Sequence, residues 1–161
     1  MRLLPVLALL AALAAHAQER SYTLASGETV SYRLVDEAGD SARPTAQQLL
    51  KLLAAGEIDA AAELSNAPPR RREVLRDYQA TVGEAEFRRV FGEYAERRVV
   101  AEFAIGERRL IVWDLGDASH HLAGQYFVRA GERFVLDDVP GEERQRLQRL
   151  LAAYRAGRLK P

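Results

Sequence analysis

The hydrophobic pattern of the chain changes from a helical to a strand period near Arg97, and this change constrains the fold more than any other feature. Before it, apolar residues recur at the helical spacing; they are Val74, Leu75, Tyr78, Val82, Phe87, Val90, Phe91 and Tyr94. After it, residues 99–105 alternate as in a strand, and Gly106-Glu107 leads into a second apolar run at 108–115. This second pattern predicts a hairpin with a two-residue turn. The chain is therefore expected to belong to the α+β class.

Both faces of this hairpin are predicted to be apolar. Pairing Ile105 with Arg108 places Phe103 opposite Leu110 and Ala101 opposite Val112 on one face, and Val100 opposite Trp113 and Glu102 opposite Ile111 on the other. A sheet with two apolar faces is covered on both sides. The second cover is the C-terminal helix, the N-terminal hairpin or a partner subunit.

Turn residues and apolar spacing predict the remaining elements. They are a hairpin over 21–36 around Ser26-Gly27-Glu28, helices over 45–55 and 57–65, two helices within 70–94 divided by Gly83, a hairpin of 121–129 and 133–137, and a final helix over 141–156. Thr45 and Gln48 are expected to form a capping box at the start of the first helix.

The first seventeen residues are predicted to be a signal peptide. Met1 and Arg2 precede an apolar run, and Ala15-His16-Ala17 fits the small-x-small cleavage pattern, so cleavage is expected after Ala17. The run is interrupted by Pro5 and is shorter than the roughly 20 residues that span a bilayer, so no stable membrane anchor is expected. Residues 18–161 then form a single domain that is periplasmic or secreted, in a bacterium.

Composition excludes several classes of function. The chain has no cysteine, which rules out a lipid-modified N-terminus and disulfides. Its 23 basic and 23 acidic side chains balance, which argues against nucleic acid as a partner. Neither a Gly-x-Ser-x-Gly motif nor a glycine-rich phosphate loop occurs, so hydrolytic and nucleotide-dependent functions lack support and no cofactor is predicted.

Histidine and aspartate gather in one segment, where His120-His121 lies near Asp114 and Asp117. Imidazole and carboxylate groups together suit zinc or similar ions. Adjacent histidines on a strand point to opposite faces, however, and no third and fourth ligand follow at a suitable spacing. A polar loop between the hairpins is therefore the preferred interpretation, and no metal site is predicted.

Several polar and aromatic residues are candidates for a binding site. Asp137 with Tyr78 or Tyr126 offers a carboxylate and a hydrogen-bond donor, while Trp113 is either a ligand platform or part of the core. Asp138 is expected to cap the final helix, because Pro140 stands where a helix would start.

A second candidate site is the basic run Arg70, Arg71 and Arg72, near a predicted helix N-terminus. Positive charge is unfavourable there because of the helix dipole. The run is either an anion-binding site or a solvated first turn paired with nearby acids.

The segment from Leu49 to Asp77, with its Leu-Leu-Lys-Leu-Leu-Ala-Ala-Gly-Glu-Ile-Asp phrase, resembles the opening helices of the NTF2-like superfamily. The resemblance extends over residues 45–138, where helices precede the strands. It implies a bent antiparallel sheet of about four strands, a cone-shaped pocket between helices and sheet, and frequent dimerisation through the sheet. It implies no particular reaction.

The sequence as a whole favours a non-catalytic domain that binds a small apolar ligand or another protein of the cell envelope. One alternative is an NTF2-like acid/base enzyme of the isomerase or dehydratase type, using Asp137 or another carboxylate with a tyrosine. A third is a homodimeric structural or accessory module, suggested by the two apolar faces of the central hairpin.

Overall fold

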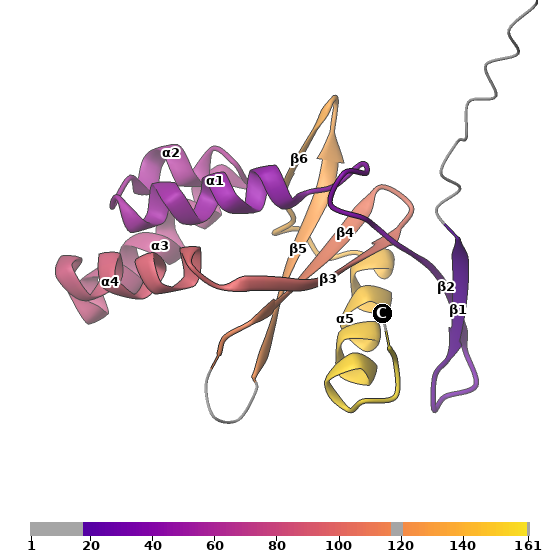
Figure 1. Ribbon diagram of the computed structural model, residues 1–161. Coiled ribbons are helices and arrows are strands. Elements are labelled where there is room, and N and C mark those ends of the chain that lie inside the picture. Colours follow the sequence, from indigo (N-terminus) through magenta and orange to yellow (C-terminus); the bar gives the residue numbers. More distant parts are fainter. Residues whose placement is uncertain (1–17, 117–120, 161) are drawn as a thin grey trace, which may run out of the picture.

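A computed structural model of the protein describes residues 18–116 and 121–160. In these residues six strands form one antiparallel sheet, and helices lie on both of its faces (Figure 1). The helices are α1 (Arg43–Ala54), α2 (Ile58–Ala62), α3 (Pro68–Val82), α4 (Glu84–Ala95) and α5 (Glu142–Arg155). The strands are β1 (Glu19–Thr23), β2 (Thr29–Leu34), β3 (Arg98–Ile105), β4 (Arg108–Asp114), β5 (Leu122–Ala130) and β6 (Arg133–Leu136). The predicted α+β class is confirmed.

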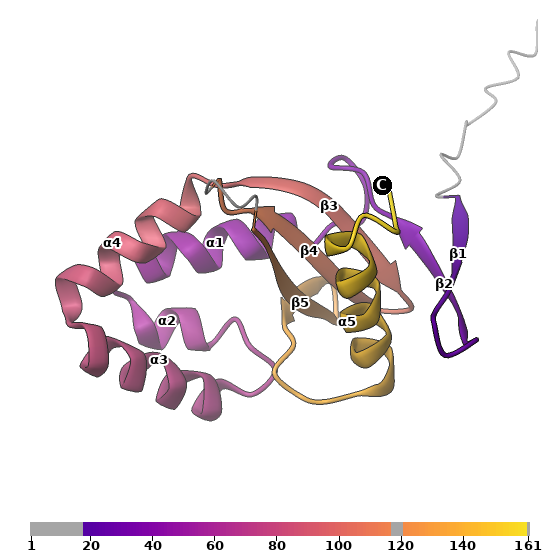
Figure 2. The ribbon, with the colours of Figure 1, turned by 90° about the horizontal axis from the view of Figure 1, so that it is seen from below.

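The elements stack in four layers. Helices α1 to α4 form a layer on one side of the strands β3 to β6, with α1 in contact with β6, and α5 lies against the other face (Figures 1 and 2). The hairpin β1–β2 lies beyond α5, so this helix is enclosed between the hairpin and the rest of the sheet. The predicted signal peptide, residues 1–17, lies outside the described residues. None of the described helices combines the length and apolar composition that crossing a membrane requires.

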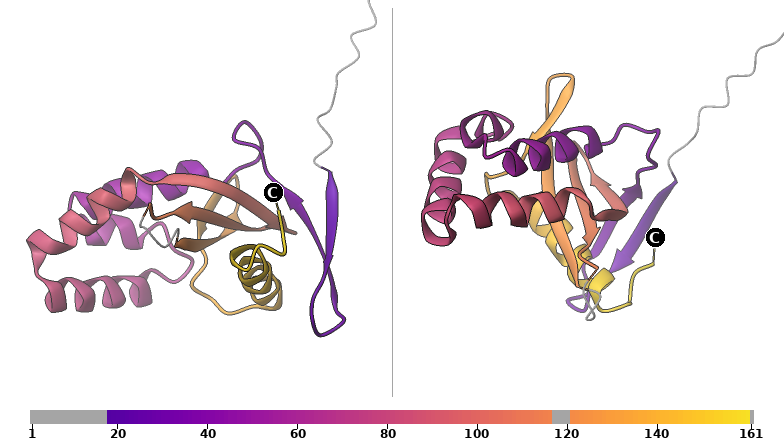
Figure 3. Two further views of the ribbon diagram at one scale, coloured as in Figure 1. Left: turned by 60° about the horizontal axis from the view of Figure 1, so that its bottom comes forward. Right: turned by 60° about the vertical axis from the view of Figure 1, so that its left-hand side comes forward.

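The strands follow one another in chain order across the sheet, β1-β2-β3-β4-β5-β6. The expected number of about four strands was too low, because the N-terminal hairpin joins the same sheet. Its attachment is short: only Arg33 and Leu34 of β2 pair with β3, opposite Ala104 and Phe103. Beyond those two pairs the hairpin diverges from the sheet to pass over α5, as Figure 3 shows.

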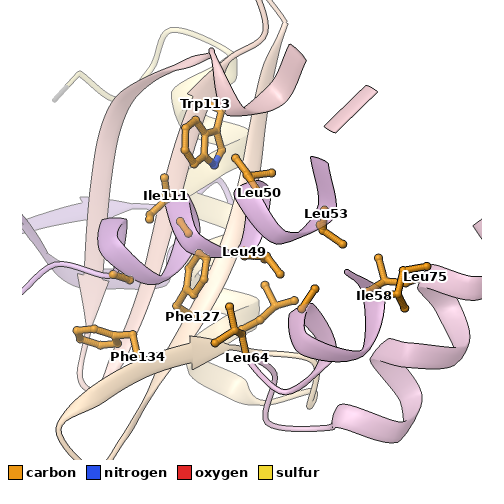
Figure 4. Close-up of a cluster of buried hydrophobic side chains, with 14 of the residues drawn as sticks. Leu49, Leu50, Leu53, Ile58, Leu64, Leu75, Ile111, Trp113, Phe127 and Phe134 are labelled. Atoms are coloured by element: carbon orange, nitrogen blue, oxygen red, sulfur yellow. The ribbon is translucent and has the colours of Figure 1, made fainter. Parts of the chain in front are cut away.

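The helical layer packs on the sheet through a core that we call the helix-side core (Figure 4). Its buried members include Leu49, Leu50 and Leu53 of α1, Ile58 and Leu64 of the α2 segment, Leu75 of α3, and Phe87 of α4, against Ile111, Trp113, Phe127 and Phe134 of the strands. The leucines of α1 recur at the helical period, which places them on one face of the helix. Burying that face against the strands holds the helical layer to the sheet.

A second core, the α5-side core, fills the other face of the sheet. Leu147, Leu150 and Leu151 of α5 pack on the strands and, on the far side, against the hairpin residues Val30 and Tyr32. The second cover of the central hairpin is therefore α5 of the same chain, with β1–β2 outside it. The observation that suggested a partner subunit is thus accounted for within one chain, and the homodimer itself remains a prediction.

The central hairpin β3–β4 has the predicted turn and most of the predicted register. Phe103 stands opposite Leu110, and Glu102 stands opposite Ile111. The predicted pairing of Val100 with Trp113 was wrong, because Val99 takes that place and the register shifts between Val99 and Ala101. Such a bulge adds one residue to a strand and increases its local twist.

Helix α1 starts in a different way from the predicted capping box. It begins at Arg43, and Thr45 instead donates its hydroxyl hydrogen bond across to the carbonyl of Phe134, at 2.8 Å. The amide of Ala42, the N-cap residue, donates to Oε1 of Glu102 at 2.8 Å, so a carboxylate from β3 binds the backbone just before the helix. The capping group comes from a distant strand, which local sequence patterns do not reveal.

Candidate functional site

Part of the outer edge of β5 has no neighbouring strand. β6 pairs with β5 only from Phe127 to Ala130, so residues 122–126 are paired with β4 on one side and open on the other. Helices α3 and α5 stand on either side of this open stretch (Figure 2). The site is therefore a strand edge between two helices.

Two adjoining pockets lie in this region, and together we call them the α3–α5 groove. One, of about 370 Å³, lies between the start of α3 and the start of α5 and is lined by Arg70, Val74, Pro140 and Gln145. The other, of about 300 Å³, extends inward to Gly124 of β5. Arg71, Asp138 and Arg144 line both pockets. A space of this size is in the range of sites for small ligands.

The inner end of the groove is apolar. Leu49 and Leu53 of α1, Leu75 of α3, Phe91 of α4 and Leu136 of β6 line it. They belong to the helical layer and its core, which therefore supplies both the support and the inner wall of the groove. An apolar group of a ligand would leave water here at a gain of roughly 25 cal/mol per Å².

Asp138 and Arg71 form an ion pair at the point where the two pockets meet. Arg71 donates from Nε to Oδ2 of Asp138 at 2.9 Å and from Nη2 to Oδ1, and Ser65 donates its hydroxyl to Oδ2 at 2.6 Å. Burial alone raises the pKa of Asp138, but the hydrogen bonds from Arg71 and Ser65 outweigh it and hold the pKa below its ordinary value. Asp138 is therefore a carboxylate that balances one of the three arginines of the groove.

The expectation that Asp138 caps the final helix was wrong. α5 begins at Glu142 with Gly141 at the N-cap position, and no side chain caps it. The side chain of Asp138 turns instead to the start of α3, where Arg71 and Ser65 hold it. The guanidinium of Arg71 gives Asp138 two charge-assisted hydrogen bonds, which are among the strong ones in proteins.

Asp137 is fully committed to protein contacts, although it lines the inner pocket. It is only 2 % exposed, and its two carboxylate oxygens accept from Nδ2 of Asn66 and from Nε of Arg108, each at 2.9 Å. Arg108 also donates to Glu143 of α5 at 2.7 Å. Asp137 therefore joins the α2–α3 connection, β4 and α5.

Arg144 is a partly buried cation of the groove that forms no ion pair with a described residue. Its guanidinium lies over the ring of Tyr126, with the central carbon 5.3 Å from the ring centroid. Its Nε atom is shielded from solvent but has no hydrogen-bond partner in the described chain. Burial raises the pKa of Tyr126, so this ring stays neutral beneath the cation. Within the same described residues Arg70 forms no ion pair either, and it is exposed at the rim.

The structure brings together four of the seven residues that the sequence singled out. Arg70, Arg71, Tyr126 and Asp137 all line the α3–α5 groove.

The other three residues lie elsewhere. Arg72 pairs with Asp59 and Glu63 on the helical layer. The ring of Tyr78 packs on Phe87 and Phe91, with centroids 5.8 Å and 6.1 Å away.

Trp113 belongs to the helix-side core and donates from Nε1 to Oε1 of Gln125 at 2.9 Å. It also lines a separate small pocket of about 120 Å³ with Leu50 and Tyr94. Trp113 therefore packs in the core, as the alternative interpretation held, and its flank reaches a minor hollow outside the groove.

The segment around His120 that was weighed as a metal-site candidate is only partly described. Asp117 and His120 lie outside the described residues. Asp114 accepts from the amide of Gly116 at 2.9 Å and lies 3.6 Å from Arg98. Among the residues that the structure describes, no group of three or more acidic, histidine or cysteine side chains is placed to hold a metal ion.

Sequence reasoning missed Arg144, Gly124 and Gln125. Arg144 belongs to a helix with several arginines, and spacing alone does not distinguish it from the solvated ones, Arg146 and Arg149. Gly124 gave a signal that was available, since an isolated glycine inside a strand often marks the close approach of another segment.

Comparisons of the chain with protein-family models, with curated proteins and with solved structures give no match. The resemblance to the NTF2-like superfamily stays a prediction, and function has to be argued from the groove itself.

Proposed function

We propose that this domain is a non-catalytic binding module whose α3–α5 groove holds a ligand with an anionic group and an apolar body. The observation that carries the proposal is Arg144, a cation shielded from water at Nε and without a hydrogen-bond partner there in the described chain. A polar group buried in this way costs free energy until a partner satisfies it. A ligand anion is such a partner.

The charge balance of the groove supports an anion. Arg70, Arg71 and Arg144 line it, and only Asp138 opposes them, because Arg108 and Asn66 already bind Asp137. The net charge of the lining is therefore positive, although the whole chain is neutral. Positive charge gathered on low-dielectric walls attracts anions more strongly than the same charge spread over a surface.

The apolar inner wall supports a ligand that is more than a simple ion. Leu53, Leu75 and Phe91 lie behind the arginines, so a ligand that reaches them buries an apolar portion. A carboxylate, sulfonate or phosphate with a hydrocarbon or aromatic body has both parts. An inorganic anion has only the first.

A fluorescence titration with 1-anilinonaphthalene-8-sulfonate tests the proposal, since this probe carries a sulfonate on an aromatic body. We expect saturable one-to-one binding that octanoate displaces and octyltrimethylammonium does not. Arg144→Met should weaken binding roughly tenfold to a hundredfold, the range for a lost hydrogen bond to a charged group.

The matched control is Arg133→Met. Arg133 is exposed at the start of β6 and forms no ion pair with any described residue. The Arg133→Met substitution removes the same charge far from the groove and should leave the affinity for the probe unchanged. Equal affinities of the Arg144→Met variant and the parent protein would refute the proposed function.

An acid/base enzyme is the second candidate, because Asp137 and Tyr126 line one pocket. A general base must reach the proton that it removes with a free lone pair. Asp137 is 2 % exposed and is held by Asn66 and Arg108, so its carboxylate is hardly accessible to a substrate, and burial raises the pKa of Tyr126, so its phenol keeps its proton. Binding is therefore better supported than catalysis.

We infer from the leader alone that the domain works outside the cytosol. Expression of the full chain in a bacterium should yield a periplasmic protein whose first residue is Gln18. N-terminal sequencing of that protein tests the inference, and a protein that keeps Met1 in the cytosol would contradict it.

A further inference from the structure

The open stretch of β5 presents backbone hydrogen-bonding groups to the groove. In an antiparallel sheet the N–H and C=O of alternate residues point to the same neighbour. The backbone N–H of Arg129 donates to the backbone carbonyl of Glu107 on the β4 side. The backbone carbonyl of Tyr126 accepts from the N–H of Asp137 on the outer side. Leu122 and Gly124 have the same parity as Tyr126, so their backbone groups also point outward.

These outward groups are only partly used. The carbonyl of Tyr126 accepts from the amide of Asp137 at 2.8 Å, and the carbonyl of Leu122 accepts from Nε of Arg155 at 2.7 Å. Between them, the N–H and C=O of Gly124 have no partner in the described part of the chain. A strand edge with unpaired groups is a template for another extended chain.

Proteins usually protect such an edge with a charge, a bulge or a covering element. Here α3 and α5 stand beside the edge and leave the groove between them, so the edge is flanked and still accessible. Gly124 itself bears no side chain that could cover the backbone groups at this edge. A Cβ built there would come within 2.5 Å of Cδ2 of Leu151, so α5 packs against this glycine from one side.

We propose that the α3–α5 groove binds an extended, acidic peptide segment, which adds to β5 as a further strand. This rests on the proposed function and names the class of its ligand. Main-chain bonds to the N–H and C=O of Gly124 supply the affinity of strand addition, and the side-chain pockets supply the specificity. A small amphipathic molecule would leave these main-chain groups unused.

The two walls of the groove define the pattern of the peptide. Side chains of an added strand alternate between the two faces of the sheet. On the helical face they meet Leu53 and Phe91, and on the α5 face they meet Arg144, which stacks on Tyr126. The preferred segment therefore alternates apolar with acidic residues, and its negative charge complements the arginines.

Fluorescence polarisation with a labelled hexapeptide, three repeats of Leu-Asp, tests the proposal on the mature protein. We expect saturable binding, at least tenfold tighter than that of the matched peptide with three Leu-Lys repeats, and loss of the preference in Arg144→Met but not in Arg133→Met. The same binding for both peptides would overturn the charge argument.

Backbone methylation tests the strand pairing directly. A strand added to β5 donates N–H groups from alternate residues only. We compare two methylated hexapeptides: the first carries a methyl group on every leucine amide, and the second on every aspartate amide. The peptide whose methyl groups block the pairing N–H groups should lose at least tenfold in affinity. The remaining peptide should bind as the unmethylated peptide does. Equal affinities of the two methylated peptides would overturn strand addition.

The failure of this proposal is distinguishable from that of the proposed function. If the naphthalene sulfonate binds through Arg144 while the Leu-Asp peptide does not bind, the groove takes a small amphipathic anion and only the peptide proposal falls. If neither ligand binds, both fall together.

Discussion

Glu102 carries a carboxylate that is only 1 % exposed and faces the start of α1. Ser41 donates its hydroxyl to this carboxylate, the amide of Ala42 donates at 2.8 Å, and Nε of Arg43 lies 3.4 Å away. Burial raises the pKa of Glu102 above its ordinary value of 4.5, although these groups oppose the shift. The side chain therefore links sheet and helix at an electrostatic cost.

The raised pKa of Glu102 leads to a prediction about how the stability of the protein depends on pH. A carboxyl whose pKa is higher in the folded than in the unfolded chain adds stability at low pH, and that contribution is lost as the pH rises through the folded value. Glu102→Gln removes the titration but keeps an acceptor for the amide of Ala42. The free energy of unfolding of the variant, relative to the parent, should therefore rise as the pH increases above about 4.5.

Urea denaturation at several pH values between 4 and about 7 measures this difference. Glu102→Leu is the contrasting variant, because it leaves the buried amide of Ala42 without an acceptor and should cost about 1–3 kcal/mol at every pH. Parallel stability curves for Glu102→Gln and the parent would show that Glu102 does not titrate in this way.

At this same scale the sequence indicated some roles and concealed others. Arg70, Arg71, Tyr126 and Asp137 stood out by their chemistry and do line the groove. The partners of Asp138 and Thr45 could not be predicted, because each bonds a residue more than sixty positions away. Capping patterns describe neighbours along the chain and are silent about such contacts.

At the scale of elements, the packing of α5 on β5 depends on a glycine, Gly124, which has no side chain to keep the helix away. A Cβ at Gly124 would meet Cδ2 of Leu151 at 2.5 Å and Cδ1 of Leu110 at 3.0 Å. Gly124→Ala should therefore destabilise the protein by about 1–3 kcal/mol, as overpacked cores do. Gly92→Ala is the control, since no heavy atom lies within 4 Å of the added Cβ in α4 and alanine favours a helix by roughly 0.5–1 kcal/mol.

Thermal unfolding of the two variants should thus move in opposite directions. A stabilised or unchanged Gly124→Ala variant would mean that α5 adjusts its distance from β5 easily, and the approach of the two elements would then not depend on glycine.

Most elements were predictable because each depends on local signals. The division of α3 from α4 at Gly83 and the turn at Gly106-Glu107 follow from residue type and period. The bulge at Val99 was not predictable, since it depends on how the whole sheet twists. Nor was the membership of β1–β2 in the sheet, which rests on the two pairs made by Arg33 and Leu34.

For the whole molecule, that short attachment predicts unequal stability. The hairpin β1–β2 pairs with β3 at two positions, whereas β3 and β4 pair over their full lengths. Segments with few contacts to the rest open at lower free energy than the core. Native-state hydrogen exchange should therefore give β2 amides a smaller opening free energy than β4 amides. Identical values would indicate that the hairpin opens only with global unfolding.

The enclosure of α5 also has a consequence for the order of assembly. Glu28, near the beginning of the chain, pairs with Arg149, which is separated from it by 121 positions. While the polypeptide is being made, the hairpin emerges before α5, so its apolar residues Val30 and Tyr32 have no helix to pack on until α5 follows. A chain truncated before α5 leaves the α5-side core without its central helix, so the hairpin β1–β2 should be more sensitive to proteases than the helix-side core.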